Sequence, residues 1–119
     1  MDIKKLTLAQ IVELLDGNVI CNNSDLSGTV SYGFASDLLS DVLTLDRTDV
    51  LFLTGLCNTQ TIRTAEMADI NQIVFVRGKI VTPEMCQIAR ENNIVLIQSP
   101  MSMFRACGIL YSTGLNPVY

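Results

Sequence analysis

Histidine is missing from this chain, and three common motifs of catalysis and nucleotide binding are missing as well. Histidine is the most frequent general base of enzymes and a common zinc ligand, so its absence argues against both kinds of site. The sequence also contains no Walker loop, no Gly-x-Gly-x-x-Gly and no Gly-x-Ser-x-Gly. These motifs mark phosphate-binding loops, dinucleotide-binding folds and serine hydrolases. Their absence favours a protein without catalytic activity.

The four cysteines are too widely spaced to form a metal-binding Cys-x-x-Cys pair. The chain also has no run of about eighteen apolar residues, as a membrane span needs, and its N-terminus does not resemble a signal peptide. We therefore expect a cytoplasmic protein whose thiols stay reduced and metal-free, in or near the core. These thiols belong to Cys21, Cys57, Cys86 and Cys107.

Charge is scarce, because only 17% of the residues are charged while 49% are hydrophobic, and the net charge is −4. The eight lysines and arginines do not cluster in the sequence. This argues against nucleic-acid binding, which needs a basic surface to neutralise the phosphates. A small domain has much surface for its volume. The apolar excess thus indicates either a surface covered by a second copy or a partner, or a sticky monomer. We expect a homodimer.

Hydrophobic periodicity predicts strands that alternate with helices within a single domain, residues 1–119. Strands are predicted at residues 18–21, 29–35, 50–53, 72–76 and 94–98, helices at 8–16, 36–43, 59–68, 83–92 and 102–111, and a polar loop at 22–28. Such alternation implies parallel pairing with right-handed crossovers. The predicted fold class is therefore α/β, a three-layer α/β/α domain with a mostly parallel sheet.

Local signals mark where several helices should begin. Thr7, Ser36 and Thr82 each precede a helical pattern and are residue types that cap helix N-termini. In the second helix, Leu38, Leu39 and Val42 are predicted to be buried, because their spacing is helical.

Polar residues follow the predicted strands at the carboxyl edge of the sheet, where open parallel sheets bind their ligands. Helix N-termini present free N–H groups there, and Arg77 and Lys79 add positive charge. These residues form either a crevice for a small anion such as a nucleotide, or helix caps and solvated side chains. The candidate ligand-binding residues are Ser36, Asp37, Asp41, Thr54, Asn58, Thr59, Arg77, Gly78, Lys79 and Ser99.

An enzymatic role has few residues to support it. Asp37 and Asp41 are four apart, so on one helix they would share a face. They could bind Mg²⁺ or act as acid and base, or be one acid at the helix N-terminus and one solvated acid. Cys57 precedes a helix, where a thiolate is favoured, but it lacks a basic partner. We expect no catalytic residue, no metal and no cofactor; an enzyme using Asp37, Asp41 or Cys57 is the least favoured alternative.

The segment Gly33 to Leu43, Gly-Phe-Ala-Ser-Asp-Leu-Leu-Ser-Asp-Val-Leu, resembles a signature of small stand-alone bacterial DRTGG-domain proteins, Tyr-(Ala/Val)-Ser-Asp-Leu-Leu-Ser-Asp-Val. The strand at 49–53, the strand-glycine turn at 76–78 and the strand at 94–98 agree with the same family. The family is remotely similar to the N-terminal domain of HPr kinases, and related domains occur in phosphotransacetylases and in pyrophosphatases with CBS domains. The resemblance implies a Rossmann-like fold for the whole chain.

The resemblance also implies a function, because DRTGG domains are regulatory or interaction modules and are often dimeric. We therefore expect a non-catalytic homodimer that senses a small anionic ligand, with a protein partner but without nucleic acid or membrane binding. Small members tend to be encoded near iron-only hydrogenase genes. An alternative is thus an assembly or scaffold factor for a hydrogenase-type redox system, without a ligand of its own.

Overall fold

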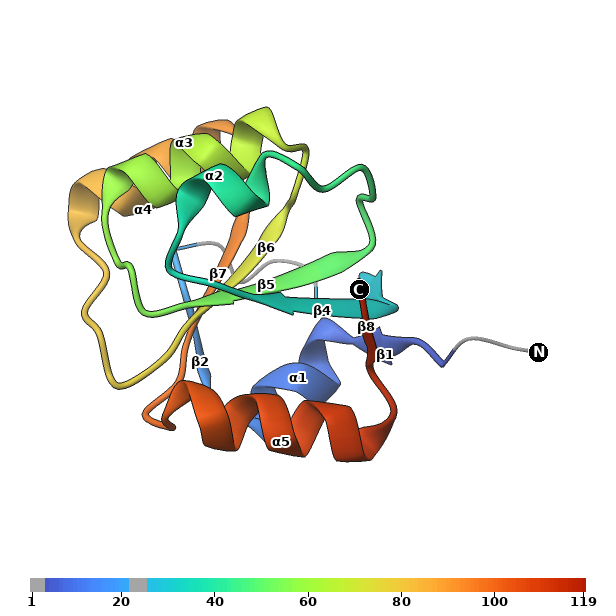
Figure 1. The fold of residues 1–119 in the computed structure, drawn as a ribbon. Coiled ribbons are helices and arrows are strands. Elements are labelled where there is room, and N and C mark those ends of the chain that lie inside the picture. The colour runs from blue at the N-terminus through green and yellow to red at the C-terminus, as the bar shows by residue number, and fades with distance from the viewer. Residues whose placement is uncertain (1–3, 22–25) are drawn as a thin grey trace.

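The computed structural model describes residues 4–21 and 26–119, so the predicted loop at 22–28 lies partly outside the described residues. Its main sheet has the order β2-β7-β6-β5-β4-β8 (Figure 1). The strands are β2 (Asn18–Ile20), β4 (Tyr32–Ala35), β5 (Val50–Thr54), β6 (Gln72–Phe75), β7 (Val95–Gln98) and β8 (Asn116–Pro117). A second, two-stranded pairing joins β1 (Leu6–Thr7) to β3 (Thr29–Val30).

Helices cover both faces of the main sheet (Figure 1). One face carries α2 (Leu39–Val42), α3 (Thr59–Met67) and α4 (Pro83–Glu91), and the other carries α1 (Leu8–Leu14) and α5 (Met103–Thr113). Successive side chains of a strand point to opposite faces. Accordingly, Phe52 and Phe75 pack in the core under α3 and α4, whereas Leu51 and Val74 pack in the core under α1 and α5. The predicted three-layer α/β/α architecture is confirmed.

The sheet is mixed, where the sequence predicted mostly parallel pairing. Strand β2 runs antiparallel to β7, with Val19 opposite Ile97. The pairs β4–β5, β5–β6 and β6–β7 are parallel, and β8 pairs parallel to β4. The chain after β2 leads to β3 and not through a crossover helix back into the sheet. No βαβ crossover therefore constrains the direction of β2.

Two local predictions around Ser36 were wrong. The predicted strand at 29–35 is divided at Ser31 into β3, which pairs with β1, and β4 in the main sheet. The helix predicted at 36–43 is only Leu39–Val42, and Ser36 does not cap it. Instead, the Ser36 hydroxyl accepts a hydrogen bond from the Leu38 N–H at 3.0 Å, which stabilises a turn before the helix.

The same shift of the helix start changes which of its leucines are buried. Val42 is fully buried as predicted, Leu39 is half-buried, and Leu38 is exposed because it lies in the turn before the helix. Two other predicted caps are confirmed: the Thr7 and Thr82 hydroxyls accept hydrogen bonds from the N–H groups of Gln10 and Met85.

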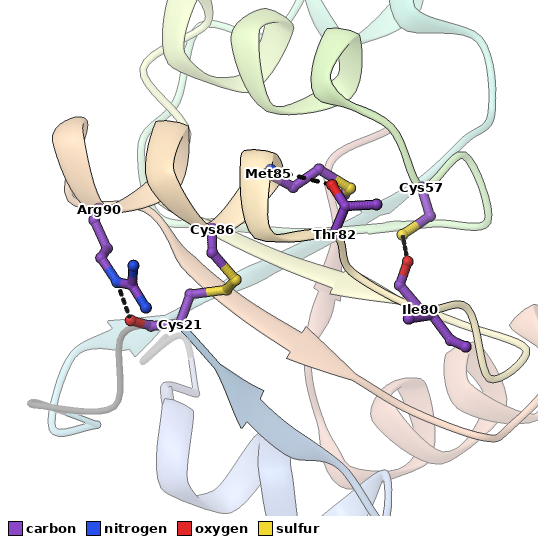
Figure 2. The surroundings of a disulfide bond; sticks show 7 residues. All are labelled: Cys21, Cys57, Ile80, Thr82, Met85, Cys86 and Arg90. Atoms are coloured by element: carbon purple, nitrogen blue, oxygen red, sulfur yellow. Dashed lines mark hydrogen bonds between the residues drawn. A yellow bond between two sulfur atoms is a disulfide. The ribbon is translucent and has the colours of Figure 1, made fainter.

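A disulfide bond joins Cys21, just after β2, to Cys86 in α4, so the prediction that all thiols are reduced was wrong for this pair (Figure 2). Their Cα atoms lie 5.0 Å apart although the residues are 65 positions apart in the sequence. The Arg90 Nε atom donates a hydrogen bond to the Cys21 carbonyl at 2.8 Å, beside the same contact. The disulfide thereby fastens the edge strand β2 to helix α4.

No helix within residues 4–21 and 26–119 has both the length and the apolar character that a membrane crossing requires.

Candidate functional site

The candidate site is built around Asp37, which follows β4 at the carboxyl edge of the sheet. Because β4 and β5 pair in parallel with Ala35 opposite Leu53, the residues just beyond these positions lie side by side. One carboxylate oxygen of Asp37, Oδ1, accepts hydrogen bonds from the Thr54 hydroxyl at 2.9 Å and from the Gly55 N–H at 2.8 Å. The turn after β4 is therefore attached to the end of β5.

These hydrogen bonds keep Asp37 ionised. The Gly55 N–H is the largest cause of the lowered pKa of Asp37, and burial, the next largest effect, opposes it in part. The Thr54 hydroxyl and the positive charges of Arg77 and Lys79 lower the pKa further. The other carboxylate oxygen, Oδ2, faces Arg77 Nη2 at 3.8 Å, and both side chains are about half-exposed. The site thus has one fixed anion that remains accessible from solvent.

Arg77 and Gly78 follow β6 in an uncommon backbone conformation, with φ angles of 66° and 67°. This left-handed region is unfavourable for a side chain such as arginine. The Arg77 N–H donates to the Met101 carbonyl at 2.7 Å, and the Gly78 N–H donates to the Ser99 carbonyl at 3.0 Å. The turn is therefore held by the segment that follows β7.

Lys79 is positioned by the end of β7, because its carbonyl accepts a hydrogen bond from Gln98 Nε2 at 2.7 Å. Its side chain is exposed, as is that of Arg77. Two cations and one carboxylate thus come together at the ends of β4, β5 and β6. Such a group can bind phosphate through the cations and can accept a hydrogen bond from a hydroxyl group through Asp37 Oδ2.

Several predicted site residues serve the fold instead. The Asn58 Oδ1 atom accepts the Thr61 N–H at 2.9 Å and so caps α3, of which Thr59 is the first residue. Ser99 is buried, and its hydroxyl donates to the Leu15 carbonyl at 2.7 Å and accepts from the Met101 N–H at 3.2 Å. Ser36 stabilises its own turn, as described above.

Asp41 is separate from Asp37, so the prediction that they share a helix face was wrong. Asp37 lies before α2, whereas Asp41 lies within it and is exposed. Among the described residues, no three cysteine, aspartate or glutamate side chains gather in a way that could hold a metal ion.

Cys57 also differs from the prediction of a favoured thiolate. Partial burial raises the pKa of its thiol, and the nearby charge of Lys79 opposes this effect only in part. The thiol donates a hydrogen bond to the Ile80 carbonyl at 3.4 Å (Figure 2). Cys57 is therefore a poor nucleophile at neutral pH.

The sequence places Gly55 and Gln98 at the carboxyl ends of predicted strands, but the candidate ligand-binding residues did not include them. Gly55 provides the N–H that binds Asp37, and its missing side chain leaves room for the Arg77 side chain to fold back over it. A glycine directly after a fully buried strand was the available signal. The contact of Gln98 with Lys79 had no signal in the sequence, because it depends on how the end of β7 meets the turn after β6.

Comparisons with known proteins give no match to a protein-family model and none to a curated protein. Among solved structures, the chain is similar to the CBS and DRTGG domains of the regulatory region of Clostridium perfringens pyrophosphatase, a structure described as complexed with an activator, diadenosine tetraphosphate. The TM-score is 0.75 with 15% sequence identity, over 94% of this chain and 48% of the other. The chain thus spans about half of that structure, and the likeness shows a shared α/β fold.

Proposed function

We propose that this chain is a non-catalytic regulatory module, a homodimer related to DRTGG domains with a Rossmann-like fold, that senses a small anionic ligand such as a nucleotide. The observation that carries the proposal is the group formed by Asp37, Gly55, Arg77 and Lys79 at the carboxyl edge of the sheet. The fold shared with a regulatory region that was crystallised with a nucleotide activator supports it. The resemblance of residues 33–43 to DRTGG-domain proteins supports it as well.

The chemistry of the group suits a nucleotide better than a bare anion. Arg77 and Lys79 supply exposed positive charge for phosphate oxygens. A bare anion would be repelled by Asp37, whereas a nucleotide also carries ribose hydroxyls. Asp37 Oδ2 can accept a hydrogen bond from such a hydroxyl, as an acidic residue does in dinucleotide-binding folds.

Backbone strain at Arg77 is a second reason to assign this residue to binding. A left-handed conformation at a residue other than glycine costs of order 1–3 kcal/mol and tends to occur at functional sites. Glycine would adopt the same φ without this cost. Other residues of the chain, such as Cys21 and Asp69, share this conformation, so the strain supports a binding role for Arg77 only together with its exposed guanidinium group at the site.

The test is a thermal-shift experiment with ATP, ADP, diadenosine tetraphosphate and inorganic phosphate. A ligand at about 100 times its Kd adds about 2.7 kcal/mol to the free energy of unfolding, which raises Tm by several degrees in a domain of this size. The shift should disappear in Arg77→Gln and Lys79→Gln. It should persist in Arg63→Gln, which removes an exposed charge from α3.

If none of the four compounds raised Tm, the sensor proposal would be overturned, and the alternative of a scaffold without a ligand would be favoured. Equal shifts in Arg77→Gln and wild type would place the binding elsewhere. Turnover of any nucleotide that is lost in Asp37→Ala would instead identify an enzyme.

A further inference from the structure

Helix α5 lies against one face of the sheet (Figure 1), and two of its large aromatic side chains are exposed to solvent. The exposed fraction is 91% for Phe104 and 70% for Tyr111. The opposite face of the same helix buries Ala106 and Leu110 against the core. The exposed side of α5 therefore carries two large aromatic residues next to the polar residues Arg105 and Ser112, whereas a surface helix normally presents mainly polar residues to water.

Gly108 lies on this exposed face between the two aromatic residues, in the interior of the helix. A β-carbon at Gly108 would meet no atom within 4 Å, and its φ is not in the left-handed region. Neither packing nor backbone geometry in this chain therefore requires glycine. Glycine in a helix interior costs about 1 kcal/mol relative to alanine, and a small residue at such a position allows a second helix to approach closely.

The spacing of the three residues favours a second copy of this chain as the approaching partner. Phe104 lies four residues before Gly108 and Tyr111 lies three residues after it. If two α5 helices cross in opposite directions at Gly108, Phe104 of one copy lies opposite Tyr111 of the other, and the reverse. This reciprocal contact is what a two-fold interface requires.

A small pocket beside α5 could receive an aromatic ring from a second copy. It has a volume of about 110 Å³ and lies between α5 and the edge formed by β4 and β8, with Cys107, Tyr111 and Leu115 in its lining. Because Tyr111 lies at this pocket, Phe104 of the other copy would be placed at its mouth. The face therefore carries both a protruding ring and an apolar recess that could receive one.

The two aromatic residues supply only part of the area that a stable interface needs. Their side chains would bury roughly 300 Å² in each copy, which is less than half of the about 800 Å² per partner in a standard interface. The remainder can come from the flanks of α5 and from the C-terminal segment. Such an interface would cover Phe104 and Tyr111, whereas the exposed side chains of Leu38, Met67 and Ile80 lie on other elements.

We infer that the face of α5 formed by Phe104, Gly108 and Tyr111 is the two-fold interface through which two copies of this chain associate. The inference rests on the dimeric state in the proposed function, and it is independent of the ligand.

The first test is sedimentation equilibrium at micromolar concentration. Wild type should sediment with twice the 13.1 kDa mass of one chain, and Gly108→Arg should sediment as a monomer. Gly108→Arg should also remain folded, because the space around Gly108 is open and arginine is a better helix former than glycine. Gln87→Arg, which adds the same charge to the exposed side of α4, should remain dimeric.

The second test is disulfide crosslinking of Gly108→Cys in a Cys107→Ser background, with oxidised glutathione as the oxidant. Two cysteines that meet on the two-fold axis should form a covalent dimer, whereas Gln87→Cys in the same background should not. A dimeric wild type whose Gly108→Arg variant also stays dimeric would overturn the α5 interface and leave the dimer itself intact. A monomeric wild type would overturn both, while nucleotide binding is decided separately by the thermal shift.

Discussion

The guanidinium group of Arg77 lies so close over Gly55 that a β-carbon on Gly55 would come within 3.0 Å of the guanidinium carbon. The N–H of the same glycine donates to Asp37 at 2.8 Å. The φ of Gly55 is not in the left-handed region, so backbone freedom is not the reason for glycine here. Gly55 instead leaves the space in which the cation and the carboxylate of the site can approach each other.

Gly55→Ala should therefore disturb the site more than the fold. The new methyl group would displace the Arg77 side chain, which is half-exposed and can move. We expect the free energy of unfolding to change by less than about 1 kcal/mol, while the nucleotide-induced rise in Tm falls to the level of Arg77→Gln. Gly28→Ala is the matched control, because its β-carbon would meet only the Leu8 side chain at 3.7 Å. An undiminished shift in Gly55→Ala would show that the position of Arg77 is unimportant for binding.

Arg77→Gly should preserve or increase stability while it abolishes binding. Relief of the left-handed strain gains about 1–2 kcal/mol, and the greater freedom of glycine in the unfolded chain offsets about 0.5–1 kcal/mol of that gain. Urea unfolding measures the first effect and the thermal shift measures the second.

Asp69→Gly provides the control for Arg77→Gly, because Asp69 also has a left-handed φ, of 60°, but follows α3 away from the site. The free energy of unfolding of Asp69→Gly should stay the same or rise, as in Arg77→Gly, but this variant should still bind the nucleotide. A loss of more than about 1 kcal/mol in Arg77→Gly would mean that the arginine is needed for folding and would remove the argument from strain.

The carboxylate of Asp37 should make stability depend on pH in the acidic range. Its pKa is lowered in the folded state, chiefly by the Gly55 N–H. A group with a lowered folded-state pKa contributes stability above its unfolded-state pKa, about 3.9, and that contribution is lost as the pH falls through the folded-state pKa. Asp37→Asn should therefore cost about 1 kcal/mol at pH 7, since the side chain is half-exposed, and the difference from wild type should shrink below about pH 4.

Urea unfolding of both proteins between pH 7 and pH 2.5 measures this difference. Asp41→Asn, on the exposed side of α2, should stay within about 0.5 kcal/mol of wild type at pH 7. A difference between Asp37→Asn and wild type that is constant over the whole pH range would contradict the assignment.

Reduction of the Cys21–Cys86 disulfide should lower stability by about 2–4 kcal/mol, because the bond restricts the unfolded chain. Cys86→Ser should unfold at the urea concentration of the reduced wild type, and added reductant should not change it further. In the denatured but unreduced protein, a thiol reagent should label Cys57 and Cys107, which are the free cysteines of the structure. Labelling of all four cysteines without reductant would contradict the pairing.

Cys107→Ser is the control for the disulfide. Cys107 is half-buried and unpaired in the structure, so its replacement should leave the effect of reductant intact.

Short-range patterns were sufficient for much of the fold. The buried strands β5, β6 and β7 follow from continuous apolar runs, and Thr7 and Thr82 cap their helices through contacts with residues three positions away. The sequence alone also placed Asp37, Thr54 and Arg77 at one edge of the sheet. Parallel strands bring their carboxyl ends together whatever the details of packing.

The remaining features depend on contacts between distant parts of the chain, which no local pattern encodes. Val19 pairs antiparallel with Ile97, and Cys21 reaches Cys86, only after β2 is docked at the edge of the sheet. Asp41 lies apart from the site because α2 begins only at Leu39, after the turn in which Asp37 accepts a hydrogen bond from Gly55 at the end of β5. Hydrophobic periodicity and capping thus determined the long helices and the central strands, but not the short strands β1 and β8 or the start of α2. Only the tertiary structure decided which side chains meet, because register and docking are set by packing across the whole core.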